Sequence, residues 1–262
     1  MIGVLANQKG GVAKTINTLH LGSALAKRGY KTLLIDLDPQ CDLTHAVGIK
    51  NKDFFNVIDL IENKGNLNFR EKADNFFILP GSDDFISNKY KRTALKDVLY
   101  KEFPNGKTIN DYFDFIFLDC PPSKINIENS NKKFEFSEVE IALSASDFFL
   151  IPLKADDFSV KNADKFLGKV SKFMKTHNLK INFLGFFFSC ILSTENSKDY
   201  YTEIFSNNGS DLLFDSFIRQ DSQVKKAVQK GLTIFQHNPN CRSANDYINF
   251  TKEFLKRLKY EE

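Results

Sequence analysis

The feature that most constrains this chain is a short loop, rich in glycine and lysine, near its first residues. Residues 7–15 read Asn-Gln-Lys-Gly-Gly-Val-Ala-Lys-Thr. The apolar run Met1–Ala6 predicts a buried strand, and the apolar spacing from Ile16 onward predicts a helix that ends near Gly29. A strand, a glycine loop and a helix in this order form a phosphate-binding loop of the Walker A kind.

The residue types in this loop suit the phosphates of a nucleotide. Gly10 and Gly11 let successive backbone N–H groups point at phosphate oxygens, and the following helix adds its positive N-terminal end. Lys14 is predicted to reach the β- and γ-phosphates, and the Thr15 hydroxyl is predicted to bind Mg²⁺. The predicted nucleotide contacts are Lys9, Gly10, Gly11, Val12, Ala13, Lys14, Thr15, Ile16 and Gln40.

Two positions depart from the ordinary spacing G-x-x-x-x-G-K-[ST]. Ala13 stands where glycine usually precedes the lysine, and we expect it to be tolerated with a negative φ. Lys9 is an additional lysine at the start of the loop. A lysine in an arbitrary loop would simply face solvent, but the position of Lys9 directly before Gly10 and Gly11 favours a functional role.

The spacing K-G-G-x-x-K-T resembles the deviant Walker A box of the ParA/MinD family of ATPases. This resemblance implies that Lys9 crosses a dimer interface and contacts the nucleotide bound in the other subunit. Lys9 and Lys14 are therefore both predicted to be catalytic residues.

Two further apolar runs end in carboxylates. Lys31–Asp38 predicts a central strand with Asp36 and Asp38 at its carboxyl end, where open α/β sheets bind ligands. Tyr112–Asp119 predicts a second strand, in which Asp119 has the place of a Walker B aspartate that holds Mg²⁺ directly or through water. The Cys-Pro-Pro-Ser string that follows ends this strand, because proline offers no N–H to a ladder.

The string Asp-Leu-Asp-Pro-Gln at 36–40 resembles the ParA branch in particular, as does Asp-Cys-Pro-Pro at 119–122. This resemblance implies that Asp38 organises the attacking water, that Asp36 lies nearer the Mg²⁺ shell and that Gln40 helps to enclose the site. A structural carboxylate at a strand end is the alternative for Asp36. The predicted metal ligands are Thr15, Asp36 and Asp119, and the predicted catalytic residues are Lys9, Lys14 and Asp38.

The rest of the chain alternates between predicted strands and helices. Asp147–Ala155 and Ile181–Leu192 are predicted strands, and Ser243–Lys259 is a predicted final helix. This order predicts an α/β fold, a doubly wound, mostly parallel sheet flanked by helices. The resemblance covers nearly the whole chain and implies a single ParA-like P-loop ATPase domain over 1–262. The segment after Leu212 reads Ile-Arg-Gln where relatives read Ile-Pro-Arg-Asn, so the adenine contacts stay undefined.

The net charge is +3, so the chain is not uniformly basic, but cations gather in its C-terminal half. The family resemblance implies that the ATP-bound dimer binds DNA nonspecifically through basic residues of that half, in salt-dependent phosphate contacts. A solvated surface is the alternative for any one of these lysines. The residues that we predict to bind DNA are Arg219, Lys225, Lys226, Lys230 and Arg242.

Other features bear on location. The four cysteines form no C-x-x-C pair and no signal peptide precedes the loop, which favours a cytoplasmic protein. The family resemblance implies in addition that the protein is nucleoid-associated. The apolar spacing near the C-terminus is typical of a helix packed on the core, so membrane binding is not expected. Asn126–Lys133 reads as an inserted loop, either a tolerated surface insertion or an adaptation of the γ-phosphate switch to a partner.

Together these motifs resemble a ParA/Soj-type partition ATPase. The resemblance implies a homodimer that forms with ATP and Mg²⁺, nonspecific DNA binding, and slow hydrolysis stimulated by a ParB-like or centromere-binding adaptor protein. The cargo stays open between a plasmid, a chromosome and another large body. One alternative is a MinD-like or cargo-positioning ATPase that acts on a membrane or protein assembly. Another is a metabolic P-loop enzyme, such as a dethiobiotin-synthetase-like ligase or an iron-protein reductase.

Overall fold

A mixed sheet organises the fold, and its order in the described residues is β3-β4-β2-β5-β1-β6-β7-β8. The computed structural model describes residues 1–50, 54–126, 135–192 and 210–260. Neighbouring strands are parallel, apart from the antiparallel pair of β3 and β4. The strands are β1 (Ile2–Leu5), β2 (Thr32–Asp36), β3 (Arg70–Ala73), β4 (Phe76–Leu79), β5 (Phe115–Asp119), β6 (Phe148–Leu153), β7 (Asn182–Ile191) and β8 (Ile218–Arg219).

The central strands are apolar along their whole length because helices cover both faces of the sheet. β1, β2, β5 and β6 are buried at every residue, which is the continuous pattern of parallel strands between two helix layers. The strands predicted within Met1–Ala6, Lys31–Asp38, Tyr112–Asp119, Asp147–Ala155 and Ile181–Leu192 are confirmed.

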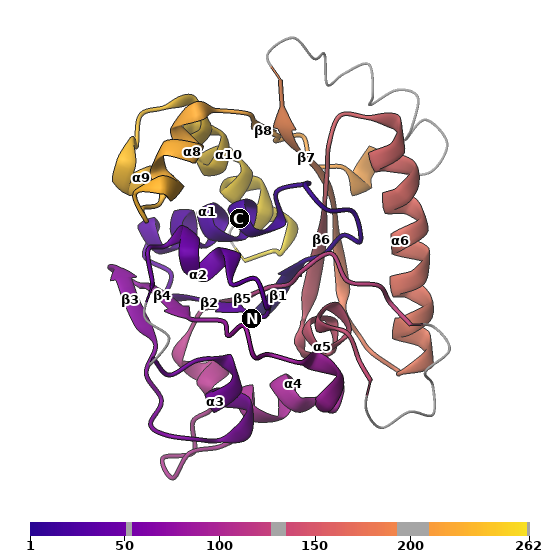
Figure 1. Cartoon of the computed structure of the whole chain (residues 1–262). Helices are drawn as coiled ribbons and strands as arrows, with labels where there is room; N and C mark the ends of the chain where they lie inside the picture. Colours follow the sequence, from indigo (N-terminus) through magenta and orange to yellow (C-terminus); the bar gives the residue numbers. More distant parts are fainter. Residues whose placement is uncertain (51–53, 127–134, 193–209, 261–262) are drawn as a thin grey trace.

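The helices form one layer on each face of the sheet, and each layer has its own hydrophobic core (Figure 1). One layer holds α1, α2, α8, α9 and α10, and the other holds α3, α4, α5 and α6. The predicted doubly wound, mostly parallel α/β fold is therefore confirmed. The helices are α1 (Lys14–Lys27), α2 (Asp42–Ala46), α3 (Val57–Glu62), α4 (Ala94–Leu99), α5 (Glu138–Ala145), α6 (Asp157–Thr176), α8 (Ser222–Gln229), α9 (Ile234–His237) and α10 (Arg242–Arg257).

The final helix, α10, packs on the core as its spacing predicted. Tyr247, Phe250, Phe254 and Leu255 are all buried in the layer that contains α1. This packing uses the apolar face of the helix, so that face is not free for a membrane. Among the described residues, none of the helices has the length and hydropathy that a bilayer span requires.

Sequence patterns missed the β3–β4 hairpin. β3 is short and polar, and its residues are only half-buried or exposed. Asn75 forms the turn with φ 60, a left-handed conformation that asparagine tolerates. A polar edge strand of this length carries no apolar alternation, which is why the pattern did not reveal it.

The topology brings three functional segments to one edge of the sheet. β1 leads into the glycine loop, and its neighbour β5 ends at Asp119. β2 pairs with β5 on the other side, in a register that sets Asp36 directly opposite Asp119. The loop and both predicted metal-site acids therefore meet at the carboxyl ends of neighbouring parallel strands.

Ala13 does not have the negative φ that we expected. It lies at the N-cap of α1 with φ 59 and ψ 34, in the left-handed region. An L residue is strained there by about 1 kcal/mol because its Cβ approaches the following carbonyl oxygen, whereas glycine is not. The same strain explains why glycine usually precedes this lysine.

The substitution Ala13→Gly should therefore stabilise the nucleotide-free protein. We expect the free energy of unfolding in urea to rise by roughly 0.5 kcal/mol, since relief of strain outweighs the greater entropy of glycine in the unfolded chain. Ala24→Gly, within α1, should instead lower it by about 1 kcal/mol. A loss of stability in Ala13→Gly would contradict the left-handed conformation.

Candidate nucleotide-binding site

The loop between β1 and α1 is fastened to the sheet through Asn7. The Asn7 Nδ2 donates to the carbonyl of Pro152 at 2.9 Å, and the Asn7 Oδ1 accepts from the backbone N–H of Lys9 at 2.9 Å. On the other side, a Cβ atom at Gly10 would lie 3.9 Å from the Pro122 ring. The loop is thus held between β6 and the segment that follows β5.

Lys14 is buried beneath this loop, with its Nζ donating to the carbonyl of Lys9 at 3.3 Å. Burial lowers the pKa of Lys14, while the nearby Cys120, Asp119 and Asp38 raise it. The ammonium group therefore lies between the loop and the acidic strand ends, which is the place required to bind a phosphate beside a metal ion.

Lys9 is held by a residue that the sequence analysis missed. Its Nζ donates to both carboxylate oxygens of Asp156, at 2.9 and 3.0 Å. The two side chains are 29% and 39% exposed, so this ion pair is worth about 1 kcal/mol or less. Asp156 also caps α6, accepting from the backbone N–H of Ser159 at 2.6 Å. An aspartate just before a helix is the signal that could have found it.

Asp119 ends β5 in full burial. Neither of its carboxylate oxygens has a hydrogen-bond partner among the residues that the structure describes. Burial raises the pKa of Asp119 well above its usual value, and Asp36 raises it further, while the Thr15 hydroxyl and Lys14 lower it. An unpartnered carboxylate in this position needs a cation to balance it.

Asp36, in contrast, is held by hydrogen bonds. Its Oδ2 accepts from the backbone N–H and the hydroxyl of Thr44, at 2.9 and 2.6 Å, and its Oδ1 accepts from the backbone N–H of Asp38 at 3.1 Å. Burial raises the pKa of Asp36 to about 6, and these hydrogen bonds oppose the rise. Asp36 therefore fastens α2 to the end of β2, in addition to lying beside Asp119.

Asp38 is buried near Lys14, just beyond the end of β2. Its Oδ1 accepts from the backbone N–H of Gln40 at 2.9 Å. Burial raises the pKa of Asp38, and Lys14 opposes that rise. The Gln40 side chain is exposed and lines a separate cavity of about 310 Å³ together with His45 and Lys50. The structure thus places Asp38 beside Lys14 of the predicted phosphate loop, while the contact of Gln40 with the nucleotide stays a prediction.

The donor set at the strand ends fits Mg²⁺, an ion that prefers oxygen ligands and retains water and phosphate ligands. Asp119 offers two unpartnered oxygens, and the Thr15 hydroxyl lies beside them. Within the described ranges, no cluster of three or more His, Cys, Asp or Glu side chains could hold a metal alone. Such a sparse set suits an ion that arrives with a nucleotide.

A cavity of about 590 Å³ adjoins the start of α1, and the predicted contacts Ala13 and Ile16 line it. A buried chain of hydrogen bonds supports its wall. The hydroxyl of Tyr247 donates to the Asn17 Oδ1 at 2.8 Å, and the Asn17 Nδ2 donates to the Ser189 Oγ at 2.8 Å. This cavity has room for the base and ribose of a nucleotide whose phosphates lie on the loop.

The segment 218–221, which the family resemblance associates with the adenine, forms one wall of this cavity. Lys154, which sequence reasoning did not identify, forms part of another. The Lys154 Nζ lies 3.8 Å from the position of a Cβ atom on Gly11, so it is a third lysine close to the loop. No spacing marks Lys154 in the sequence, because it follows an ordinary buried strand.

The segment after β5 is tied to α5. The Ser123 hydroxyl donates to Glu138 at 2.5 Å, and the backbone N–H of Asn126 donates to Glu140 at 2.8 Å. From residue 127 onward, the predicted insertion Asn126–Lys133 lies outside the described residues. The described part of this segment is therefore braced between the glycine loop and α5.

The five residues predicted to bind DNA lie on β8, on α8 and at its end, and at the start of α10. Arg219 makes a bidentate ion pair with Asp246, whose Oδ2 lies 2.9 Å from the Arg219 Nε. Lys225 lines the 590 Å³ cavity, and Arg242 donates to the carbonyl of Gln220 at 3.3 Å. Arg219 thus joins β8 to α10, and a structural role accounts for its charge.

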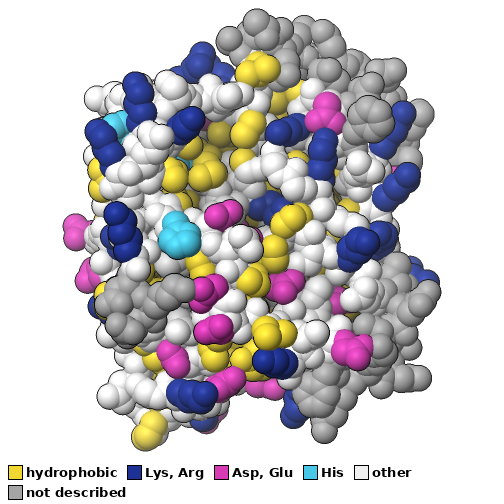
Figure 2. Space-filling model, in the orientation of Figure 1, with side chains coloured by type: hydrophobic (Ala, Val, Ile, Leu, Met, Phe, Trp, Pro, Cys, Tyr) yellow, Lys and Arg dark blue, Asp and Glu magenta, His cyan; other side chains and the backbone are white. Residues whose placement is uncertain are grey.

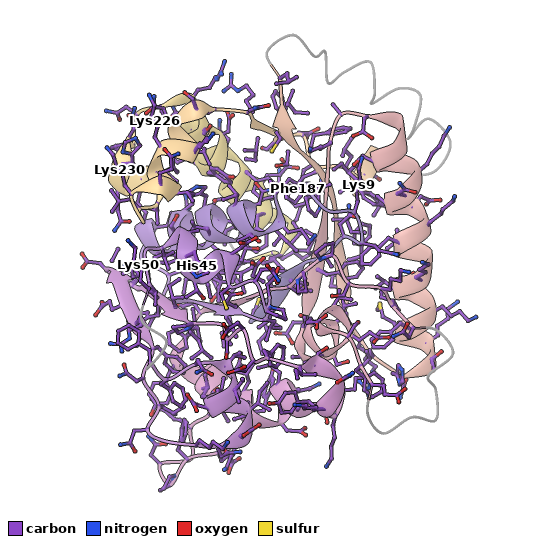
Figure 3. The ribbon with its side chains drawn as sticks, viewed as in Figure 1. Lys9, His45, Lys50, Phe187, Lys226 and Lys230 are labelled. Atoms are coloured by element: carbon purple, nitrogen blue, oxygen red, sulfur yellow. The ribbon has the colours of Figure 1, made fainter. Side chains whose placement is uncertain are left out.

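Lys226 and Lys230 are exposed along α8 and at its end, where basic side chains gather on the upper left of the surface in Figure 2. Figure 3 shows both on the same side of the molecule as Lys50, which follows α2. The contact between these segments is close, since a Cβ atom at Gly231 would lie 2.7 Å from the Gly48 Cα. The segment beyond Asp38 therefore touches the basic end of α8.

The burial of Asp119 predicts that Asp119→Asn stabilises the protein in EDTA without nucleotide, by roughly 2 kcal/mol at pH 7.5. The pKa of Asp119 is raised in the folded state, so ionisation of this carboxyl destabilises the fold. This destabilisation is absent below the pKa of Asp119 in the unfolded chain and grows as pH rises toward its pKa in the folded state. The advantage of the variant in urea unfolding should thus be smaller at pH 5 than at pH 7.5. Asp164→Asn, an exposed change on α6, should have no such effect, and equal gains in both variants would refute the explanation.

The chain is similar to known proteins both in sequence and in fold. The family model described as "AAA domain" matches residues 1–183. The chromosome-partitioning ATPase Soj of Treponema pallidum is 28% identical over 265 residues, covering 97% of this chain and 96% of the relative.

Solved structures have the same fold. Apo McdA from Cyanothece superposes with a TM-score of 0.77 at 22% identity, covering 97% of this chain and 98% of that one. The septum site-determining protein MinD of Pyrococcus horikoshii, complexed with Mg-ADP, gives a TM-score of 0.72 at 18% identity, covering 97% and 94%. With two lysines in its phosphate loop and these matches over most of its length, the chain belongs to the AAA-domain family and, within it, to the ParA/Soj type of ATPase.

Proposed function

We propose that the protein is a partition ATPase that dimerises with Mg²⁺ and ATP, binds DNA nonspecifically as a dimer and is released when hydrolysis is stimulated by a ParB-like or centromere-binding adaptor. The observation that carries this proposal is the pair of lysines on one phosphate loop. Lys14 is buried against the acidic strand ends, whereas the Lys9 side chain is partly exposed and forms a surface ion pair with Asp156. The names of the relatives, a chromosome-partitioning ATPase and a Mg-ADP complex, support it.

Binding is assigned to the loop and to the cavity beside it. The backbone of Gly10–Thr15 and the Lys14 ammonium receive the phosphates, and the 590 Å³ cavity receives the base. Asp119 and Thr15 would hold Mg²⁺, with Asp36 adding negative charge from the next strand. When bound, Mg²⁺ neutralises charge on the phosphate oxygens, and the buried lysine adds to that stabilisation.

Asp38 is assigned the orientation of the attacking water. Asp38 is buried beside Lys14, so a water molecule bound to it would be shielded from bulk solvent. Burial also raises the pKa of Asp38, which makes its carboxylate a better acceptor for a hydrogen bond from that water. Its Oδ1 is fixed by the Gln40 backbone N–H, which leaves Oδ2 for the water. Removal of the Asp38 carboxylate should therefore slow ATP hydrolysis more than it weakens ATP binding.

Lys9 is assigned to the dimer interface. In the proposed dimer, the Lys9 ammonium breaks its ion pair with Asp156. This costs little free energy, because an ion pair between partly exposed side chains is weak. In the dimer, each Lys9 would neutralise phosphate charge in the opposite subunit, so that dimerisation depends on which nucleotide is bound. Lys226 and Lys230 would then offer phosphate contacts to DNA from the outer side of α8.

The location proposed is the cytoplasm, in association with the nucleoid. The alternative of a MinD-like ATPase that acts on a membrane rests on fold likeness at 18% identity. The buried apolar face of α10 speaks against a membrane helix at that end of the chain. Co-sedimentation with anionic liposomes in the presence of ATP separates the two functions.

Lys9→Ala should bind a nonhydrolysable ATP analogue yet remain monomeric in analytical ultracentrifugation, because the neutralising charge in the interface is lost. Lys14→Ala should not bind the analogue at all. Asp156→Asn keeps the cap of α6 but removes the ion pair, so its dimer should form up to about fivefold more tightly. A dimer of Lys9→Ala that is as stable as the unaltered one would overturn the proposed role.

Asp38→Ala should bind ATP and form a persistent dimer that hydrolyses at least ~100-fold more slowly, the typical effect of losing a positioned base. This dimer should retain DNA on a filter at low salt, and adding Lys226→Glu with Lys230→Glu should abolish retention while the dimer persists. Asp42→Asn, an exposed acid on the same segment, should hydrolyse at the unaltered rate. Rapid hydrolysis by Asp38→Ala would refute the assignment.

A further inference from the structure

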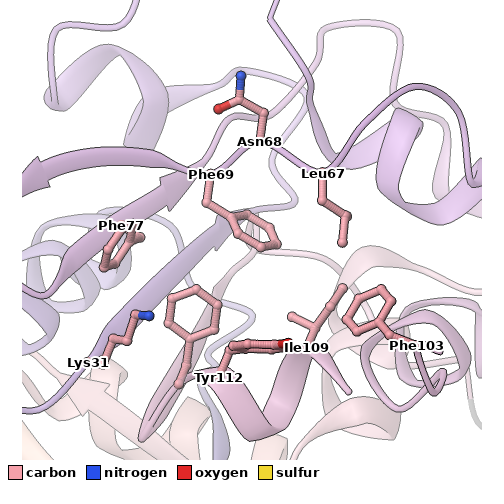
Figure 4. Close-up of a pocket in the computed structure, with 9 residues that line it drawn as sticks. Lys31, Leu67, Asn68, Phe69, Phe77, Phe103, Ile109 and Tyr112 are labelled. Atoms are coloured by element: carbon pink, nitrogen blue, oxygen red, sulfur yellow. The ribbon is translucent and has the colours of Figure 1, made fainter. Parts of the chain in front are cut away.

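A second cavity, of about 520 Å³, lies at the opposite end of the sheet from the glycine loop (Figure 4). Lys31 directly precedes β2, and Phe113 lies two residues before β5. These two strands carry Asp36 and Asp119 at their other ends. Five residues of strand separate the two ends by about 15 Å. The cavity is lined by Lys31, Leu67, Asn68, Phe69, Phe77, Phe103, Ile109, Tyr112 and Phe113.

Its walls are mostly aromatic and are fixed by ring contacts. The Phe69 and Phe77 rings each meet Phe113 edge to face, with centroids 5.5 and 5.6 Å apart. Figure 4 shows Phe69 and Leu67 pointing into the cavity from one side and Tyr112 from the other, while the Asn68 amide points away. Leu67 is 45% exposed, so the cavity is open to solvent at one end. These walls suit a flat apolar ring.

Lys31 is the one charged residue among those that line the cavity. Its Nζ lies 5.4 Å from the Phe77 centroid and 5.5 Å from that of Phe113. In the part of the chain that the structure describes, no carboxylate pairs with this ammonium. The nearby Asp114 accepts from the Lys31 backbone N–H at 2.7 Å, and Asp111 accepts from Thr108.

We propose that this cavity binds a small aromatic carboxylate, with the ring between the Phe69, Phe113 and Tyr112 side chains and the carboxylate on Lys31. A cavity of 520 Å³ is within the ordinary range for small-molecule sites, about 300–1,000 Å³. A cationic ligand is excluded by the positive charge of Lys31. A carboxylate forms an ion pair with the Lys31 ammonium, in which both donor and acceptor are charged, whereas a neutral amide offers that ammonium only an uncharged carbonyl oxygen.

The test uses 3-phenylpropionate and its neutral amide, 3-phenylpropanamide, titrated into the full chain and followed by ¹H–¹⁵N chemical shifts. The acid should bind about tenfold more tightly than the amide, and Lys31→Met should remove this difference while leaving the weak binding of the amide. Lys107→Met is the matched control. The Lys107 Nζ lies 5.6 Å from the Tyr112 ring, but the residue does not line the cavity. The Lys107→Met variant should prefer the acid over the amide as strongly as the unaltered protein does.

Equal affinity for acid and amide, no binding of either at millimolar concentration, or an equal loss of preference in both lysine variants would each overturn the proposal. Lys31 belongs to no part of the nucleotide site, so the ATPase rate of Lys31→Met should equal that of the unaltered protein. The result is therefore independent of whether the protein partitions DNA.

Discussion

The pairing of β2 with β5 is the constraint on which the rest of this structure depends. Their parallel register sets Asp36 opposite Asp119 in a place where neither side chain meets solvent. Hydrogen bonds from Thr44 and the Asp38 backbone satisfy Asp36, but Asp119 keeps two unpartnered oxygens. When Asp119 is ionised, the fold thus holds a buried negative charge that a bound cation can balance, and the nearby Lys14 lowers the pKa of Asp119.

Two sets of contacts join this charged centre to the outer helices. Asn17, on the helix that follows the loop, is bonded to both Tyr247 of α10 and Ser189 of β7. On the other side, Asp36 holds the start of α2, and the loop after α2 touches the end of α8 at Gly231. These contacts form a continuous packed connection between the phosphate site and the basic surface of α8.

Sequence reasoning was strongest where chemistry and periodicity agreed. The glycine loop, the two acidic strand ends and the buried final helix all followed from patterns over several residues. It failed where a single backbone angle or a distant partner decided the outcome. Ala13 has a positive φ because the loop geometry requires it, against the intrinsic preference of alanine. The ion pair of Arg219 with Asp246 likewise became visible only in the fold, and DNA binding by Arg219 stays a prediction.

The sequence by itself determined strands β1, β2, β5, β6 and β7, the first and last helices, the phosphate loop and the acids at the strand ends. These features depend on local periodicity and on residue chemistry at short spacing. Only the tertiary structure decided which charges are paired, since Lys9 and Asp156 are 147 residues apart in the chain and meet because β1 and β6 pair side by side in the sheet. The aromatic cavity around Lys31 likewise gathers residues from segments that no pattern connects. Burial and pairing are properties of a packed chain, and those properties set the charge states on which binding depends.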